Sequence, residues 1–383
     1  MELDRSLKIA LVSAFDYASL GGVNTHISNL SAQFRESGHQ VSIIAPCSNE
    51  DSVDETNFMP MGKPVPIPSS GSIARISLSV WLRPKIKSLL TKEFFDIVHV
   101  HNPFSGLLPI HMLEFSKSIN IATFHNYGTR LYRLGGKQLA MPSFRKIDGL
   151  IAVSEPARDY VAEHFPGQYE IIPNGILVEE FSKDVKPIET LNDGMINLLF
   201  LGRLEKRKGL KYLLAAYAKL KWDWPNLRLL IVGPGNPDEE SYQIMSERNL
   251  SDVVFVGPVS DKERARYYAS ADIYCSPATG GESFGMVLLE AMAATKPIVA
   301  TSIPGFSSVM TDGIEGLLVP PKDAESLAIS IAKLLSDPKL RHRLALNGRK
   351  HVEHFRWSNV ANRVMGVYTS KMNSHSRNTA INR

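Results

Sequence analysis

Residues 280–290 read GGESFGMVLLE, and they lie between the short β-rich run Ile273–Ser276 and an apolar helical pattern. A strand, a glycine-rich turn and a helix in this order form the repeating unit of parallel α/β sheets. The N–H groups at the start of such a helix have no partner within the helix and can hold an anion. This stretch therefore predicts an α/β fold with an anion-binding turn at the carboxyl end of a strand.

The same alternation of short β-rich runs and amphipathic helical patterns extends over almost the whole chain. In the first half the expected strands are Lys8–Ser13, Gln40–Ala45, Asp96–His99, Ile119–Phe124, Gly149–Val153 and Tyr169–Ile172. After the polar stretch Ser182–Gly194 they are Ile196–Leu201, Leu227–Val232, Val253–Val256, Ile273–Ser276 and Pro297–Ala300. We therefore expect two tandem Rossmann-like domains, each a doubly wound parallel sheet, that face a cleft.

The polar stretch near residues 185–195 sets the expected domain boundary. Residues 1–188 would form the N-terminal domain and residues 189–356 the C-terminal domain. The periodic segment 357–371 is expected to return as a helix to the first domain, and residues 372–383 to form a disordered tail. Because open α/β sheets bind ligands at the carboxyl ends of their strands, we expect the site between the two domains.

The composition is that of an ordinary soluble globular protein, with 383 residues of which 44% are hydrophobic and 21% charged. The net charge of +4 is too small to indicate a nucleic-acid partner. No run approaches the roughly 20 apolar residues of a membrane span, and Met1–Lys8 lacks the apolar core of a signal peptide. Cys47 and Cys275 lie far apart in apolar contexts, which is typical of buried thiols in a reducing compartment. We expect a cytoplasmic protein.

Two carboxylates mark the ends of the quoted stretch. Glu282 and Glu290 are eight residues apart, a distance of about 12 Å along an ideal helix, which is comparable to the span from a sugar through a diphosphate to a ribose. Glu290 would lie on an apolar helix face, where a carboxylate without a partner is costly. Its companion is expected to be either a pair of ligand hydroxyl groups or a structural Arg or Lys.

Two further loops suit a phosphate ligand. Gly21 and Gly22 open a helix after the first expected strand, although a plain turn would use the same residues and the G-x-G-x-x-G spacing is absent. Four cations lie in Gly202–Gly209, after the first strand of the second half. At a strand's carboxyl end they would neutralise a diphosphate leaving group, and the alternative is a solvated loop.

The motifs in combination resemble a known family. The E-x7-E spacing of Glu282 and Glu290 is similar to that of retaining, family-4-like glycosyltransferases with the GT-B fold. Within that family the chain resembles the phosphatidylinositol mannosyltransferases, and the resemblance covers essentially the whole chain. The stretches that carry it are Gly21–Val23, Val65–Pro68 with Gly71–Arg75, Ala122–His125 and Gly280–Gly285.

The resemblance implies a role for each matching residue. His125 would lie beside the transferred sugar, Glu282 would bind its hydroxyls and Glu290 would bind the ribose. Together with His125 and Glu282, the cations Arg203 and Lys208 would form the catalytic set and would hold the diphosphate. The donor site so implied contains Gly22, Arg203, Lys208, Val259, Asp261, Glu282, Phe284, Gly285, Met286, Val287 and Glu290.

The acceptor side is implied by the same resemblance, with two departures. Asn24, Arg75, Asn126 and Tyr127 would bind the acceptor. Asn126 and Tyr127 stand where the lipid mannosyltransferases have small hydroxylated residues, and Asn102 replaces an acid. Acceptor identity is therefore the open part of the assignment.

Asp261 bears on the base of the donor. Guanine presents two adjacent N–H donors that one carboxylate accepts together, and Asp261 aligns with the family position that does this. The alternative is that Ser260 or Asp261 is simply the N-cap of the following helix, which leaves uracil open.

The expected activity is retaining transfer of a hexose, mannose from GDP-mannose, to an inositol-type lipid or another anionic acceptor. No D-x-D motif occurs, so no obligatory metal or other cofactor is expected. The alternatives are a UDP-sugar donor with a soluble acceptor such as inositol phosphate or a sugar phosphate, a nonhydrolysing sugar-nucleotide epimerase, and an inactive binding scaffold.

A basic segment suggests contact with a membrane. Val80–Lys92 places Arg83, Lys85 and Lys87 beside apolar residues in a helical pattern that starts near Pro84. Its counterpart in the lipid mannosyltransferases meets the bilayer, so peripheral binding to the inner face of the cell membrane is expected. The alternative is a core-facing helix with a solvated basic face.

Overall fold

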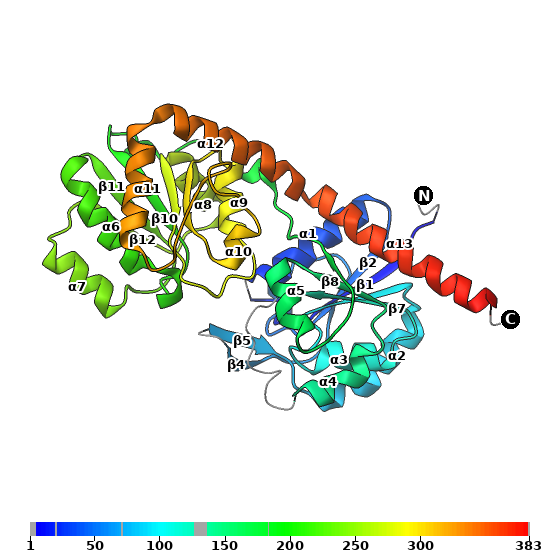
Figure 1. Ribbon diagram of the computed structural model, residues 1–383. Coiled ribbons are helices and arrows are strands. Elements are labelled where there is room, and N and C mark those ends of the chain that lie inside the picture. The colour runs from blue at the N-terminus through cyan, green and yellow to red at the C-terminus, as the bar shows by residue number, and fades with distance from the viewer. Residues whose placement is uncertain (1–4, 20, 70–71, 126–135, 183, 382–383) are drawn as a thin grey trace. The chain divides into compact units, whose positions relative to one another are not determined.

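The protein divides into two compact units (Figure 1). The computed structural model describes residues 5–19, 21–69, 72–125, 136–182 and 184–381. The first unit combines Met1–Gly175 with Trp357–Arg383, and the second unit is Ile176–Arg356.

The first unit contains a parallel sheet between helices. In spatial order its strands are β3 (Phe58–Pro60), β2 (Gln40–Ala45), β1 (Lys8–Ser13), β6 (Ile97–His101), β7 (Ile119–Phe124), β8 (Gly149–Ala152) and β9 (Tyr169–Ile171). Its helices are α1 (Gly22–Glu36), α2 (Arg83–Glu93), α3 (Leu107–Phe115), α4 (Gly136–Phe144), α5 (Glu155–Ala162) and α13 (Trp357–Ile381). A separate antiparallel hairpin joins β4 (Val65–Ser69) to β5 (Ser72–Ile76). The central strands β1, β6 and β7 are almost completely buried, because helices cover both faces of the sheet.

The second unit repeats this architecture. Its parallel sheet has the order β12 (Val253–Gly257), β11 (Leu227–Val232), β10 (Ile196–Leu201), β13 (Ile273–Ser276), β14 (Ile298–Thr301) and β15 (Leu317–Val319). Its helices are α6 (Leu210–Asp223), α7 (Glu239–Glu247), α8 (Asp261–Ser270), α9 (Met286–Ala293), α10 (Pro304–Ser307), α11 (Ala324–Ser336) and α12 (Pro338–His351). The prediction of two parallel Rossmann-like sheets is confirmed.

The division between the units falls at Gly175 and Ile176, earlier than the predicted boundary at residue 188. The N–H group of Ile176 donates to the carbonyl of Phe355 at 2.8 Å. Val178 and Phe181, which form the short 3-10 helix η4 (Val178–Phe181), are buried in the core of the second unit. The polar composition near residue 185 marks a surface segment of the second unit and not the crossing between units.

Helix α13 returns to the first unit, as expected, but extends beyond the predicted end at residue 371. It continues to Ile381, so the segment 372–381 is helical and the expectation of a disordered tail was wrong for it. Tyr368 anchors the helix, because its hydroxyl lies 2.6 Å from Nδ1 of His99 and its ring packs 5.6 Å from that of Phe34. The polar composition of the last residues concealed this helix from the sequence analysis.

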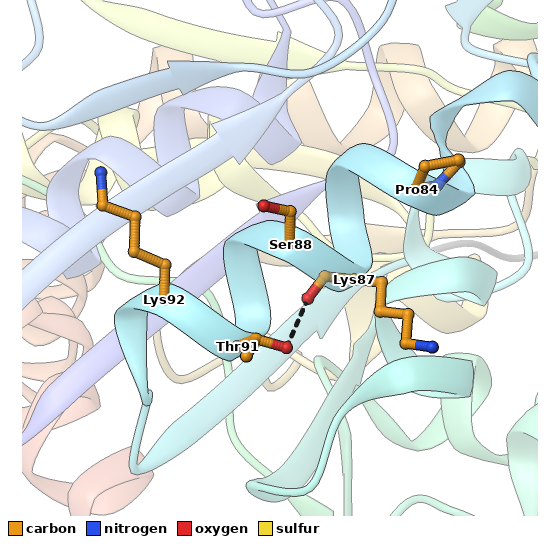
Figure 2. Close-up of a pocket in the computed structure, with 5 residues that line it drawn as sticks. All are labelled: Pro84, Lys87, Ser88, Thr91 and Lys92. Carbon is orange, nitrogen blue, oxygen red and sulfur yellow. Dashed lines mark hydrogen bonds between the residues drawn. The ribbon is translucent and has the colours of Figure 1, made fainter.

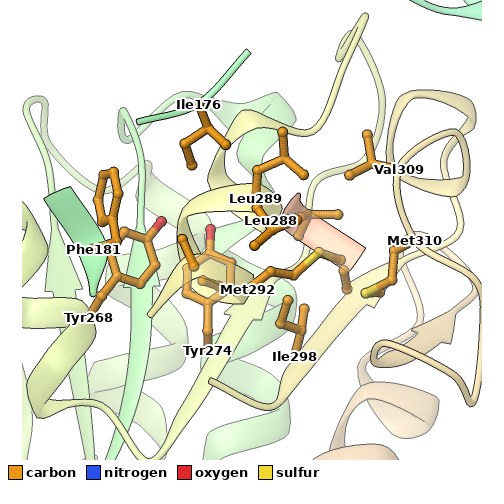
Figure 3. Close-up of a cluster of buried hydrophobic side chains, with 14 of the residues drawn as sticks. Ile176, Phe181, Tyr268, Tyr274, Leu288, Leu289, Met292, Ile298, Val309 and Met310 are labelled. Carbon is orange, nitrogen blue, oxygen red and sulfur yellow. The ribbon is translucent and has the colours of Figure 1, made fainter. Parts of the chain in front are cut away.

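A buried aromatic and aliphatic cluster holds helix α9 in place (Figure 3). Phe181, Tyr268 and Tyr274 pack around Leu289 and Met292 of that helix. Burial of this apolar area stabilises the unit by roughly 25 cal/mol per Å² removed from water. The core therefore fixes the helix that carries Glu290.

Within the described part of the chain, no helix is both long enough and apolar enough to cross a bilayer.

Candidate active site

The basic loop after β10 lies against the glycine-rich turn before α9. Nζ of Lys208 lies 2.7 Å from Oε1 of Glu282, and Nη1 of Arg207 lies 2.5 Å from the same oxygen. Arg207 also pairs with a second carboxylate, because Oε2 of Glu205 lies 2.8 Å from Nε of Arg207. The structure thus brings together Lys208 and Glu282, which are 74 residues apart in the sequence.

Glycine is required where these two loops meet. Gly209 follows the short 3-10 helix η6 (Lys206–Lys208) with a φ of +73°, and a Cβ there would lie 2.0 Å from the carbonyl oxygen of Pro277. No side chain fits at that distance, and L residues rarely adopt this φ. The glycine therefore permits the close approach that places Lys208 beside the end of β13.

Two cations of the loop differ in their surroundings. Arg203, a predicted catalytic residue, has a side chain that is 58% exposed, and its Nη1 atom lies 3.8 Å from Glu205. Arg207, which the sequence analysis did not single out, contacts Glu282 directly. Its position in the same basic motif was the available signal, but the pattern could not distinguish which cation faces the carboxylate.

Glu290 is 7% exposed and has two partners within the second unit. The hydroxyl of Tyr268 donates to its Oε2 atom at 3.0 Å, and Nη2 of Arg264 lies 3.7 Å from Oε1. Burial raises the pKa of Glu290, and Arg264 opposes that shift. The expected cationic companion is Arg264, and the helical spacing alone did not identify it.

Asp261 is the first residue of α8, but it does not cap the helix. Ser260 is the N-cap, because its hydroxyl accepts from the N–H of Glu263 while the Glu263 carboxylate accepts from the N–H of Ser260 at 3.0 Å. The side chain of Asp261 is 79% exposed, and its Oδ1 atom lies 3.3 Å from Arg264. Ser260 is therefore the N-cap of the helix, and the Asp261 carboxylate faces outward.

The remaining predicted donor residues of the second unit lie at the start of α9, except Val259, which follows β12. Gly285 is the N-cap, and Met286 and Val287 are the first, half-buried residues of the helix. Phe284 is 6% exposed and packs 6.1 Å from the ring of Phe355. Val259 is half-buried and packs against the same core.

His125 follows β7 in the first unit and is part of a buried group of histidines. Its ring atom Nε2 lies 3.0 Å from Nδ1 of His101. Its backbone N–H group donates to Oδ1 of Asn102 at 2.9 Å. His26 packs edge-on to His125 with ring centroids 4.7 Å apart, and its Nδ1 atom lies 3.0 Å from Oδ1 of Asn174. The departure at Asn102 thus has a structural use, since its amide fixes the backbone of His125.

Burial keeps these histidines neutral. It lowers the pKa of His26 to about 4 and that of His99 to about 3. It also places the pKa values of His101 and His125 well below the usual range, and the neighbouring imidazoles add to the effect. At neutral pH each ring therefore offers one lone pair and one N–H.

The residues of the first unit that were predicted to bind the phosphate or the acceptor differ in their surroundings. Gly22 is the first residue of α1 and has open space around its Cα. The Asn24 side chain is engaged within the protein, because it accepts from Ser13 Oγ at 2.7 Å and donates to the Asp16 carbonyl at 2.8 Å. Arg75 is exposed on β5, and its carbonyl accepts from the Asp16 N–H at 2.8 Å. Asn126 and Tyr127 lie outside the described residues.

The predicted membrane residues lie on α2. Lys85 and Lys87 are exposed, whereas Arg83 pairs with Glu114 at 2.5 Å and lies over the ring of Phe115 at 5.2 Å. Arg83 is therefore held by α3.

Comparisons with known proteins show the family of the chain. A family model for Glycosyltransferase Family 4 matches residues 20–180, and one for Glycosyl transferases group 1 matches residues 181–351. The chain is 36% identical over 364 residues to the phosphatidyl-myo-inositol mannosyltransferase of Mycolicibacterium smegmatis, covering 94% of this chain and 93% of that protein. It is 27% identical over 387 residues to the D-inositol 3-phosphate glycosyltransferase of Nocardiopsis dassonvillei, covering 91% and 89%.

A solved structure shares the fold. The chain superimposes on a glycosyltransferase from Rickettsia africae with a TM-score of 0.77 and 20% identity, covering 96% of this chain and 99% of that one. This chain therefore belongs to the GT-B glycosyltransferases of group 1 and family 4, and it is similar over nearly its whole length to phosphatidyl-myo-inositol mannosyltransferases.

Proposed function

We propose that the protein transfers mannose from GDP-mannose to a hydroxyl group of an inositol-type lipid, with retention of the anomeric configuration. The observation that carries this proposal is the arrangement in the second unit, where Lys208 contacts Glu282 and the buried Glu290 lies on the helix that follows. These residues match the chemistry of a nucleoside diphosphate joined to a sugar. The names of the relatives at 33–36% identity support the choice of mannose and inositol lipid.

The nucleotide is bound through its base and its ribose in this proposal. The outward-facing carboxylate of Asp261 accepts from N1–H and the 2-amino group of guanine, which favours GDP over UDP. Glu290 accepts from the ribose hydroxyls, while Tyr268 and Arg264 hold the carboxylate in place. Val259 and the start of α9 line the same donor site.

The diphosphate and the sugar meet the cations and Glu282. Lys208 and Arg203 stabilise the charge that develops on the diphosphate, together with the N–H groups at the start of α9. Glu282 accepts from hydroxyl groups of the sugar, and Arg207 remains as its ionic partner when Lys208 turns to the phosphate. In this proposal cations and amide dipoles neutralise the charge of the diphosphate in place of a metal ion, so we expect no obligatory metal.

The transfer step breaks the bond between the anomeric carbon and the phosphate oxygen as the acceptor oxygen bonds to that carbon. The acceptor attacks on the face that the diphosphate leaves, so the configuration is retained. The acceptor proton passes to the departing phosphate oxygen, and no protein nucleophile is needed. His125 lies beside the sugar as a neutral imidazole, and the exposed guanidinium of Arg75 binds the acceptor phosphate.

The surface of α2 supports a peripheral location at the cytoplasmic face of a membrane. Trp81 is 85% exposed just before the helix, and Phe94 is 78% exposed just after it. Figure 2 shows the residues that line a shallow pocket along this helix, which are Pro84, Lys87, Ser88, Thr91 and Lys92. Lysines beside exposed aromatic side chains suit an anionic lipid surface.

A second candidate keeps the chemistry and replaces the acceptor with a soluble inositol phosphate or sugar phosphate, with a UDP-sugar as the donor. The name of the Nocardiopsis relative, a D-inositol 3-phosphate glycosyltransferase, favours this acceptor class. The departures from the family pattern at Asn102, Asn126 and Tyr127 also concern the acceptor, because the resemblance assigns these segments to the acceptor side.

A panel of nucleotide sugars tests the donor. GDP-mannose should raise the melting temperature and undergo slow hydrolysis without acceptor, whereas UDP-glucose and UDP-N-acetylglucosamine should do neither. Stabilisation by UDP-sugars alone would transfer the proposal to the second candidate. Interconversion of free sugar nucleotides without hydrolysis would identify an epimerase instead.

A further inference from the structure

His101 contacts His125 through one ring nitrogen of each residue. Nδ1 of His101, the last residue of β6, lies 3.0 Å from Nε2 of His125, which follows β7. The two rings are also stacked, with centroids 5.3 Å apart and an angle of 29° between their planes. Because Nε2 of His125 faces His101, Nδ1 is the ring nitrogen that His125 has left for a ligand.

A second histidine keeps the ring of His101 in place. His99 stacks on His101 with ring centroids 4.3 Å apart, and both side chains are completely buried. The ring of His99 is itself held at both nitrogens. Its Nδ1 atom lies 2.6 Å from the hydroxyl of Tyr368, and its Nε2 atom lies 2.7 Å from Oγ1 of Thr123. The packing of the first unit therefore sets the orientation of the His101 ring.

The surroundings of His101 decide which of the two rings donates. Burial lowers the pKa of His101 and of His125 well below the usual range, so at pH 7 both rings are neutral and each carries one proton. If His125 donated from Nε2, the proton of His101 would lie on Nε2, which is buried and has no hydrogen-bond partner among the described residues. In proteins, buried N–H groups without an acceptor are rarer than buried acceptors without a donor. The protons of both rings therefore belong on Nδ1.

We propose that His101 is a positioning residue, which donates from Nδ1 to Nε2 of His125 and so fixes His125 with its proton on Nδ1. His125 then presents an N–H donor, and not a lone pair, to an oxygen of the transferred sugar. This inference rests on the proposed function for the place of the sugar beside His125. A neutral donor orients the sugar and takes no proton from the acceptor, which agrees with a transfer step in which that proton passes to the departing phosphate oxygen.

The position of the protons is tested by NMR of the full-length chain labelled with ¹⁵N-histidine at pH 7, because the chemical shift of a ring nitrogen shows whether it carries a proton. The signals that disappear in His101→Gln and His125→Gln identify the two residues among the 11 histidines. In the parent, both should carry the proton on Nδ1. In His101→Leu, which cannot donate, His125 should become a mixture of the two tautomers. In His101→Gln the side-chain amide should donate in place of the imidazole and keep the proton of His125 on Nδ1.

Steady-state kinetics with GDP-mannose separates positioning from a structural role. His101→Leu should lower kcat by about 10-fold or more, whereas KM and the affinity for GDP should stay within about two-fold, because the proposed nucleotide contacts lie in the second unit. His101→Gln should recover most of kcat. The matched control is His111→Leu, which should keep the kcat of the parent, because His111 is a buried histidine of α3 that pairs with Glu114.

The outcomes distinguish this inference from the proposed function. A parent with the proton of His125 on Nε2, or a His101→Leu variant that keeps the tautomer of the parent, would overturn the inference. Equal kcat values for His101→Leu and His111→Leu would also overturn it. If circular dichroism shows that His101→Leu does not fold, the spectrum of the parent and the kcat of His101→Gln decide. A chain that turns over no nucleotide sugar but carries both protons on Nδ1 would contradict the proposed function and still support the action of His101 on His125.

Discussion

The ammonium group of Lys208 lies 2.7 Å from Oε1 of Glu282, so a cation and a carboxylate with separate proposed roles are already in contact. The side chains are only 16% and 15% exposed, which strengthens their attraction relative to a surface pair. Arg207 contacts the same carboxylate oxygen. Glu282 therefore retains Arg207 as an ionic partner when a diphosphate draws Lys208 away. Because of this second partner, the proposed roles of Lys208 and Glu282 can be separated by mutation.

Lys208→Ala should lower turnover by about 10²-fold or more, because it removes one stabiliser of the departing diphosphate. The fold should survive, since Arg207 still neutralises Glu282. Lys206→Ala is the matched control, because Lys206 is an exposed residue of the same turn and the charge change is equal. Steady-state kinetics on both variants decides the matter: similar rates for Lys208→Ala and the parent would remove Lys208 from the reaction.

Glu282→Ala and Glu290→Ala should have different effects, because one carboxylate is proposed to bind the sugar and the other the ribose. Glu282→Ala should depress transfer while GDP affinity stays nearly unchanged. Glu290→Ala should weaken GDP binding itself. Calorimetry with GDP measures both, after melting curves have shown that each variant is folded. An equal loss of GDP affinity in the two variants would contradict the division of roles.

The stability cost of Glu290 should depend on pH. Burial raises its pKa, so the folded chain holds the proton more tightly than the unfolded chain does. The stability that Glu290 contributes is therefore present at low pH and lost as the pH rises. Relative to Glu290→Gln, which cannot titrate, the parent should be more stable at about pH 4.5 than at about pH 7. Melting temperatures of both proteins at the two pH values check the sign. If the melting temperature of the parent relative to that of Glu290→Gln stays the same or increases from the lower to the higher pH, the prediction is wrong.

Replacing Lys85, Lys87 and Lys92 with Ser should weaken binding to anionic vesicles by about 10²-fold at low salt. Each basic residue near an anionic surface is worth about 1 kcal/mol, and salt screens the effect. Arg83 is omitted because it pairs with Glu114. Vesicle cosedimentation provides the measurement.

The matched control for the membrane variant replaces three exposed lysines of the second unit, Lys333, Lys339 and Lys350, with Ser. The change in net charge is the same, so only the position of the lysines differs. If the parent stays in the supernatant, or if both triple variants pellet equally with the parent, α2 has no membrane role and a soluble acceptor is favoured.

The sequence predicted the regular parts of the fold well, because parallel strands buried on both faces read as short apolar runs. It placed β10 and β11 within their observed bounds and β6 within two residues. The short strand β15 and the hairpin of β4 and β5 were not predicted, since each is brief and lacks a clear pattern. The boundary near residue 188 was wrong because surface polarity resembles a linker in sequence.

The candidate site was predictable where a motif fixes a residue to a loop end, as for Lys208 and Glu282. The partners of buried groups were not, because they come from other elements. Arg264 and Tyr268 reach Glu290 from helix α8, 26 and 22 residues earlier in the sequence, and neither forms part of a motif. The meeting of His26 with His101 similarly depends on the order of strands in the sheet.

The measurement that tests the central claim most directly is the identification of the product formed from GDP-mannose and phosphatidylinositol vesicles. Mass spectrometry should show one hexose added to the inositol lipid, and NMR of the purified product should show the α-anomer, as in GDP-α-mannose. Inositol phosphate in water should be a poor acceptor under the same conditions. A hexosylated inositol phosphate with an unmodified lipid would contradict the lipid acceptor, and a β-linked product would contradict the retaining mechanism.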